Sequence, residues 1–197
     1  MKNFLVLAAV FAVAYANQDD YLRWVSYDGT IPDNAVPAGE DANNNTIYIG
    51  RVYLNTNTNQ SSWNYTTDAK GYVPGNLREG VVSLDTVLFQ KVHTATEGIE
   101  ILTVVNGARI EWKFVKNYQF PQLFDTEAYH VARVGWEYEG MEFNSTTYLG
   151  TVNFNDQPNI GKIFNAAVLW AENHVLYFPS QGTVLSGYSY YALVYYY

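Results

Sequence analysis

Apolar and polar side chains alternate with a period of two over several short stretches of this 197-residue chain. From Arg109 to Val115, isoleucine, tryptophan and phenylalanine alternate with glutamate and lysine, which is typical of a half-buried β-strand. Ile99 to Val105 alternates in the same way, and the Asn106-Gly107 pair between the two stretches favours a two-residue turn. The pattern therefore predicts a β-hairpin over residues 99–115.

More strands are predicted where β-branched and aromatic residues concentrate, at residues 47–49, 81–93, 163–171, 175–179 and 188–197. Little of the chain has the period of a helix. Residues 55–71 are polar and poor in aliphatic side chains, so we expect an insertion loop there. It is either a flexible glycosylated loop or a recognition loop that presents Trp63 and Tyr65. Many short strands separated by turns predict an all-β fold.

The stretch from Trp24 to Arg51 returns as a weaker copy between His130 and Thr151. Three further blocks follow in the same order in both halves, pairing residues 73–77 with 159–163, 86–89 with 167–170, and 99–102 with 190–193. Such ordered repetition predicts tandem repeats that pack together. We expect one pseudo-symmetric, antiparallel β-sandwich-like unit, made of a first repeat at 17–105 and a diverged second repeat at 106–197.

Residues 1–16 have the features of a secretory signal peptide: a cationic Lys2, an apolar run from Phe4 to Ala14, and a small-x-small end at Ala14-Tyr15-Ala16. The apolar run is shorter than the roughly 20 residues that span a bilayer. We therefore expect a secreted, extracellular protein. The chain has no cysteine, so its core alone must hold it together. Its net charge of −8 disfavours nucleic acid and anionic membranes as partners.

Asn-x-Ser/Thr sequons predict N-glycosylation at Asn44, Asn59, Asn64 and Asn144. In a secreted chain each sequon marks a predicted surface loop. Asn44 and Asn144 precede equivalent predicted strands of the two repeats, which agrees with the repeat symmetry.

The sequence templates of common enzymes are missing from the chain, including Gly-x-Ser-x-Gly, His-Glu-x-x-His and the phosphate-binding loops. The histidines, His93, His130 and His174, are far apart in sequence, and the lack of cysteine excludes zinc–thiolate sites. Neighbouring acids such as Glu40-Asp41 could serve a glycosidase, but acids in a loop more often bind hydroxyls or face solvent. We expect no enzyme, no cofactor and no metal.

The two repeats together resemble the DM-nine repeat family of tandem-repeat invertebrate proteins, and the first repeat matches better than the second. The elements that carry the resemblance are Trp24, Gly29 to Val36, Gly39 to Asp41, Tyr48 to Arg51, Pro74 to Asn76, and Ile99 to Leu102. The resemblance implies a mannose-type, carbohydrate-binding lectin that recognises microbial glycans in innate immunity.

The resemblance also implies site residues, because the family contacts mannose through the Asp of its Gly-x-Asp step and the Lys of its Pro-Gly-Lys step. Asp41 matches the aspartate, and Asn76 stands in place of the lysine. In the second repeat Glu137 replaces the aspartate and Lys162 matches the lysine. A carboxylate accepts hydrogen bonds from sugar hydroxyls, and an amide or ammonium donates them. The charged donor predicts that the second site binds better.

An alternative function stays open at this point: a non-catalytic secreted structural or interaction protein that keeps the fold and does not bind sugar. In that case Asp41 forms an Asx turn and Lys162 is solvated. Trp136, beside Glu137, either stacks on a pyranose ring or fills the cleft. A homodimer is compatible with both functions.

Overall fold

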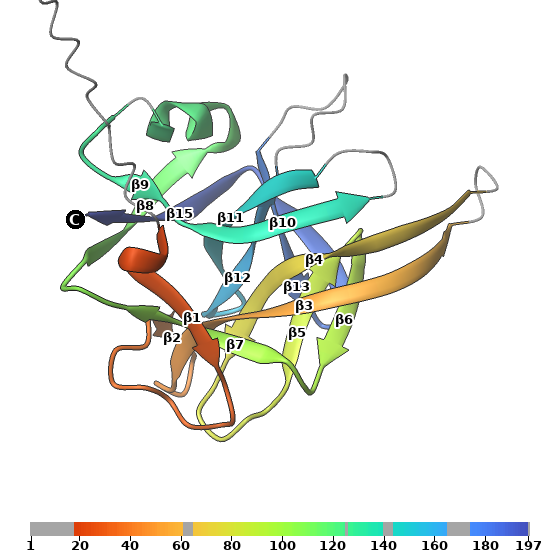
Figure 1. Cartoon of the computed structure of the whole chain (residues 1–197), viewed down its shortest axis with the longest axis horizontal. Coiled ribbons are helices and arrows are strands. Elements are labelled where there is room, and N and C mark those ends of the chain that lie inside the picture. The colour runs from red at the N-terminus through yellow and green to blue at the C-terminus, as the bar shows by residue number, and fades with distance from the viewer. Residues whose placement is uncertain (1–17, 61–64, 125, 140–143, 165–173, 197) are drawn as a thin grey trace, which may run out of the picture.

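The computed structural model describes residues 18–60, 65–124, 126–139, 144–164 and 174–196 (Figure 1). Most of these residues are in strands, and the helical segments are the 3-10 helices η1 (Gln18–Asp20) and η2 (Asn117–Phe124). The predicted all-β fold is confirmed. The predicted signal peptide lies outside the described residues. Within the part of the chain that the structure describes, no helix is long and apolar enough to cross a membrane.

Strands from both halves join one large antiparallel sheet, while β5 and β6 form a separate two-stranded sheet. The first half contributes β1 (Leu22–Ser26), β2 (Pro37–Glu40), β3 (Thr46–Gln60), β4 (Tyr65–Leu77), β5 (Leu84–Leu88), β6 (Lys91–Ala95) and β7 (Ile99–Val104). The second half contributes β8 (Arg109–Lys116), β9 (His130–Val131), β10 (Arg133–Glu139), β11 (Asn144–Phe154), β12 (Gln157–Phe164), β13 (Val175–Ser180), β14 (Thr183–Gly187) and β15 (Ser189–Tyr196).

The predicted turn at Asn106-Gly107 forms, with left-handed φ angles of 51° and 69°. The predicted hairpin is nevertheless wrong, because β7 and β8 do not pair with each other. β7 pairs with β1 and β3, whereas β8 pairs with β15. Each strand pairs with strands of its own half, so this turn is the connection between the two halves.

The predicted insertion loop at residues 55–71 is also wrong. β3 and β4 pair continuously from Tyr48 opposite Leu77 to Gln60 opposite Tyr65, and form a long hairpin that projects from the body of the molecule (Figure 1). Paired strands satisfy their backbone groups by hydrogen bonding to each other. A projecting hairpin therefore does not need the aliphatic residues by which a buried strand is recognised. Trp63 lies outside the described residues.

The two halves repeat the same strand pairings. Gly50 of β3 pairs with Ile101 of β7, and Gly150 of β11 pairs with Ala192 of β15. The residues just before β2 and β10 repeat a hydrogen bond as well. The amide of Val36 donates to the carbonyl of Leu102, and the amide of Ala132 donates to the carbonyl of Leu193, both at 2.9 Å. Tyr48 and Tyr148 lie two residues before Gly50 and Gly150, as the repeat alignment predicts.

Close backbone approaches recur at matching glycines. A Cβ added to Gly75 would lie 2.2 Å from the carbonyl oxygen of Asp85, and one added to Gly161 would lie 2.1 Å from that of Tyr177. Gly75 thus corresponds to Gly161, and the β5–β6 hairpin corresponds to the β13–β14 hairpin. This correspondence differs from the sequence alignment, which matched residues 86–89 with 167–170, a stretch outside the described residues.

The core is shared between the halves. One buried cluster combines Ile49 and Leu102 of the first half with Leu149 and Leu193 of the second. Two other clusters each lie within one half. Each half buries part of its apolar surface against the other, which agrees with the predicted merged unit. The exact repeat boundaries stay a prediction.

Candidate functional site

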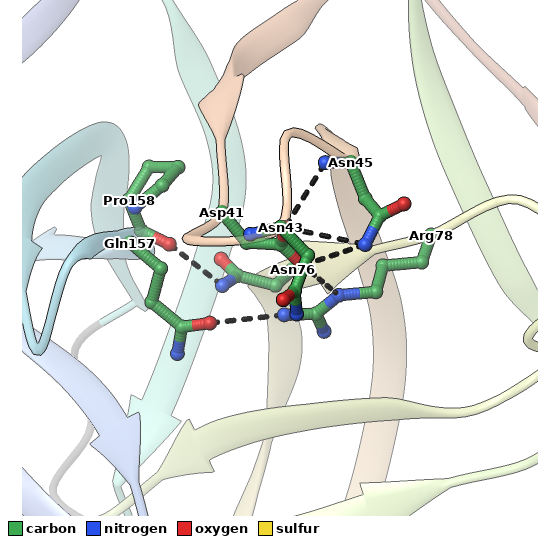
Figure 2. A network of polar contacts seen from close by, with 7 residues as sticks. All are labelled: Asp41, Asn43, Asn45, Asn76, Arg78, Gln157 and Pro158. Atoms are coloured by element: carbon green, nitrogen blue, oxygen red, sulfur yellow. Dashed lines mark hydrogen bonds and ion pairs between the residues drawn. The ribbon is translucent and has the colours of Figure 1, made fainter.

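Asp41 directly follows β2 and organises a tight acidic loop. Its Oδ1 accepts hydrogen bonds from the backbone amides of Asn43 at 2.9 Å and Asn45 at 3.0 Å, and the Asn45 side-chain amide donates to the same carboxylate (Figure 2). This is an Asx-type turn, as the structural alternative predicted. The backbone hydrogen bond from Asn45, followed by that from Asn43 and helped by the charge of Arg78, holds the pKa of Asp41 below its usual value.

Asn76, on β4, links the two halves of the molecule. Its side-chain Nδ2 donates to the carbonyl of Pro158 at 2.8 Å, and its Oδ1 accepts from the amide of Ile160 at the same distance. Both partners belong to β12. The amide of Asn76 thus imitates a strand neighbour and satisfies two backbone groups. A lysine at this position could not accept the hydrogen bond from Ile160.

Arg78 links Asp41 to Gln157, and Asn76 donates to the next residue, Pro158, so Asp41 and Asn76 lie in neighbouring polar contacts. The Nε of Arg78 lies 3.5 Å from Oδ2 of Asp41, and its Nη2 donates to Oε1 of Gln157 at 3.0 Å (Figure 2). Its side chain is 38% exposed. Sequence analysis missed Arg78 because the second repeat has Phe164 at the matching position, so the repeat gave no signal there.

A polar hollow of about 410 Å³ lies beside this network, between the end of β4, the β11–β12 turn and the β13–β14 turn. Its side chains offer both donors and acceptors of hydrogen bonds. Asp85 supplies a carboxylate, which accepts a hydrogen bond from Thr94 at 2.6 Å. The lining residues are Asn76, Arg78, Val81, Ser83, Asp85, Asn155, Gln157, Asn159, Pro179, Ser180 and Gln181.

The structure brings the second predicted pair, Glu137 and Lys162, into direct contact. The ammonium of Lys162 donates to both carboxylate oxygens of Glu137, and the Glu137 side chain is 0% and that of Lys162 4% exposed. Glu137 also accepts a hydrogen bond from the amide of Phe89 at 3.1 Å. The two residues of the predicted better sugar site are thus buried and bonded to each other, and sugar binding there stays a prediction. The alternative of a solvated Lys162 is wrong.

The turn between β5 and β6 also contacts the second pair. Phe89 and Gln90 form this turn with φ angles of 44° and 55°, a left-handed conformation that is uncommon for a bulky residue. The turn places the amide of Phe89 on Glu137. In the other half the corresponding turn, at Gln181-Gly182, only borders the hollow.

His130 and His174 pack against different aromatic rings. The ring of His130 packs 5.5 Å from that of Tyr195, and the ring of His174 lies 5.1 Å from that of Phe120. Burial lowers the pKa of His93, and the charges of nearby lysines act in the same direction. Among the described residues, no group of three or more His, Asp or Glu side chains could hold a metal ion.

Of the four sequons, each predicted to lie in a surface loop, one lies in a loop and two lie in strands. Asn44 is exposed in the Asp41 loop with a φ of 62°, as a surface loop requires. Asn59 lies in β3 and Asn144 begins β11, so both are in strands rather than in loops. Asn64 lies outside the described residues. Glycosylation at all four stays a prediction.

Comparison with known proteins gives one family. The model of the DM9 repeat matches residues 3–60, a stretch that contains Asp41 and ends before Asn76. Glu137 and Lys162 lie outside the matched residues. No curated protein sequence matches the chain.

Proposed function

Because this chain belongs to the DM9 repeat family, we propose that it is a secreted, non-catalytic protein that binds mannose-containing glycans and recognises microbial surfaces. The observation that carries the proposal is the polar hollow beside the network of Asp41, Asn76 and Arg78. We place the sugar in this hollow, between the end of β4 and two turns of the second half, and not at the Glu137–Lys162 pair.

The lining of the hollow suits a polyhydroxylated ligand. Arg78 and Gln157 can donate hydrogen bonds, while the carboxylate of Asp85 can accept them from hydroxyl groups. The volume of about 410 Å³ lies in the range of pockets that hold small molecules. Val81 and Pro179 give the hollow an apolar portion against which the C–H groups of a sugar ring can pack.

In this proposal Asp41 is a positioning residue. Its carboxylate already accepts three hydrogen bonds from its own loop, and it holds the guanidinium of Arg78 at the hollow. Asn76 lines the hollow while its amide links β4 to β12. The family's sugar-contacting positions would thus act here largely through Arg78.

The test is a calorimetric titration of the protein with methyl mannoside. A hydrogen bond to a charged group contributes about 1.5–3 kcal/mol, so Arg78→Ala should weaken binding by roughly tenfold to a hundredfold. Arg23→Ala removes the same charge from an exposed position on β1 and should bind as wild type. Equal affinity in the Arg78→Ala and Arg23→Ala variants would exclude this hollow as the site.

A second candidate function is that of a structural or interaction protein without sugar binding. It is favoured by the engagement of the family's sugar-contacting positions in internal contacts, above all the buried Glu137–Lys162 pair. Wild-type protein that binds no glycan at millimolar concentration, on an array or by calorimetry, would support this candidate and reject the lectin.

A further inference from the structure

The long β3–β4 hairpin and the adjoining β10 are neighbouring strands (Figure 1). Aromatic side chains form a row across them. Tyr53 is paired with Tyr72, and their ring centroids lie 5.3 Å apart. The ring of Trp136 meets that of Tyr53 edge-on at 6.1 Å. Tyr53 is 43% exposed, so its ring is open to solvent.

A second row lies next to the first. The strand register places Asn55 opposite Lys70, and Lys70 opposite Tyr138. The ammonium of Lys70 lies 5.2 Å from the centre of the Tyr138 ring. We call these two rows the aromatic face: Tyr53, Tyr72, Trp136 and Tyr138, with Asn55 and Lys70.

Arg51 fixes one edge of the aromatic face. Its guanidinium lies between two rings, 4.4 Å from the centre of Trp24 and 4.3 Å from that of Tyr72. Its Nε donates to Glu100 and its Nη1 to the carbonyl of Val134, both at 2.6 Å. The face is therefore built on paired strands and held from one side. Such preorganisation lowers the entropy lost when a ligand binds.

The corresponding positions of the pseudo-symmetric fold do not carry aromatic residues. In the second half Asn153 pairs with Pro158, in the same register as Tyr53 with Tyr72. Likewise Glu40, the last residue of β2, pairs with Thr46 as Trp136 of β10 pairs with Thr146, so Glu40 corresponds to Trp136. The matching positions thus carry an amide, a proline and a carboxylate. The aromatic face is therefore not repeated by the pseudo-symmetry: it joins β3 and β4 of the first half to β10 of the second. Tyr72 packs against the shared core, whereas Tyr53 is 43% exposed.

We propose that the aromatic face binds a neutral polysaccharide, by packing tyrosine and tryptophan rings against the apolar faces of successive sugar rings. An aromatic ring provides a large rigid surface, and Tyr hydroxyls, Asn55 and Lys70 can hydrogen-bond to sugar oxygens. The charge of Arg51 is already balanced by Glu100. A chain of net charge −8 also disfavours polyanions, so an uncharged polymer is the matching ligand.

This site is separate from the hollow proposed for mannose and does not depend on it. The hollow is lined by residues at the far end of β4 and by turns of the second half, and it shares no lining residue with the aromatic face. The hollow suits a short sugar segment. The face suits a longer chain, since its rings follow one another across the sheet.

The experiment measures binding to mannan immobilised on beads, with soluble methyl mannoside titrated separately. Tyr53→Ala should lower the affinity for mannan about tenfold, and Tyr53→Phe, which keeps the ring, should retain most of it. Tyr191→Ala is the matched control, because Tyr191 is also a strand tyrosine and is 41% exposed. Methyl mannoside affinity should stay unchanged in all three variants.

Each outcome separates the two sites. Mannan affinity that is equal in the Tyr53→Ala and Tyr191→Ala proteins overturns the aromatic face and leaves the hollow standing. Mannan binding that depends on Tyr53, without any methyl mannoside binding, keeps the face and rejects the hollow. Wild type that does not bind mannan, or binds heparin more tightly than mannan, overturns the face. Circular dichroism confirms that each variant is folded.

Discussion

The Asp41–Asn76 region and the Glu137–Lys162 region occupy corresponding places in the two halves, yet one borders an open hollow and the other is a buried ion pair. Their strands share the same register and the same close approach at Gly75 and Gly161. The backbone is therefore common, and the side chains decide whether the place is open. Two repeats can therefore share one backbone arrangement while only one of the two corresponding places stays accessible.

The difference has a direct physical cause. A lysine that is taken out of water needs an opposite charge, since an unpaired buried charge is very costly. Lys162 meets this need through Glu137, and the Phe89 amide completes the arrangement. Asn76 carries no charge, so its amide can instead bond to the backbone of β12 and leave the neighbouring space open.

The largest expected effect comes from breaking the buried pair. Lys162→Ala leaves Glu137 buried without its partner, so it should lower the free energy of unfolding by about 3–5 kcal/mol. The measurement is chemical denaturation followed by tryptophan fluorescence. Replacing both residues together, as Glu137→Gln with Lys162→Met, should recover much of the loss, because no charge is then buried. A Lys162→Ala protein as stable as wild type would show that the pair is not closed in solution.

The next effect tests whether the two backbones are equivalent. Gly75→Ala and Gly161→Ala each force a methyl group against a carbonyl oxygen of the neighbouring strand. Both should lose about 1–3 kcal/mol of stability through overpacking, and the two losses should be similar. The same denaturation assay applies, with Gly187→Ala as a comparison in which the nearest atom lies 3.8 Å from the added methyl. A large loss in one variant alone would argue against the repeat symmetry.

The smallest effect concerns pH. Burial holds the pKa of His93 below its usual value of 6.5, and Lys91 and Lys162 act in the same direction. The unfolded chain therefore takes up the proton first as pH falls. Neutral His93 thus contributes its full share of the free energy of unfolding above pH 6.5. This share is lost as the pH drops through the lowered pKa that His93 has in the folded protein. His93→Gln should flatten the stability profile between pH 7 and pH 5, and an unchanged slope would remove His93 as its source.

Much of the fold follows from local patterns in the sequence. The alternation in Arg109 to Val115 gave β8, and the tyrosine-rich end of the chain gave β15. Local patterns could not predict the strand partners of β7 and β8, because β7 pairs with β1 and β3 and β8 pairs with β15, which are distant in sequence. They also missed the β5–β6 turn, since Phe89 and Gln90 have none of the glycine or asparagine that signals such a turn.

The candidate site was only partly predictable. The family pattern located Asp41 and Asn76, and the repeat located Glu137 and Lys162. Neither the family pattern nor the repeat could show that Asn76 bonds to β12 or that Lys162 is buried, because both contacts join residues more than 20 positions apart. Arg78 carried no signal, since its role arises from the approach of Gln157 across the two halves.

The central claim is that, of the two corresponding regions, the one at Asp41 and Asn76 borders an accessible mannose site and the one at Glu137 and Lys162 does not. An NMR titration of ¹⁵N-labelled protein with methyl mannoside tests it most directly, because the two regions report separately. Chemical-shift changes should concentrate at the amides of Arg78, Gln157 and Ser180, which border the hollow, while the amide signals of Phe89 and Lys162 stay in place. Shifts at Phe89 and Lys162 with none at Arg78 would contradict the claim.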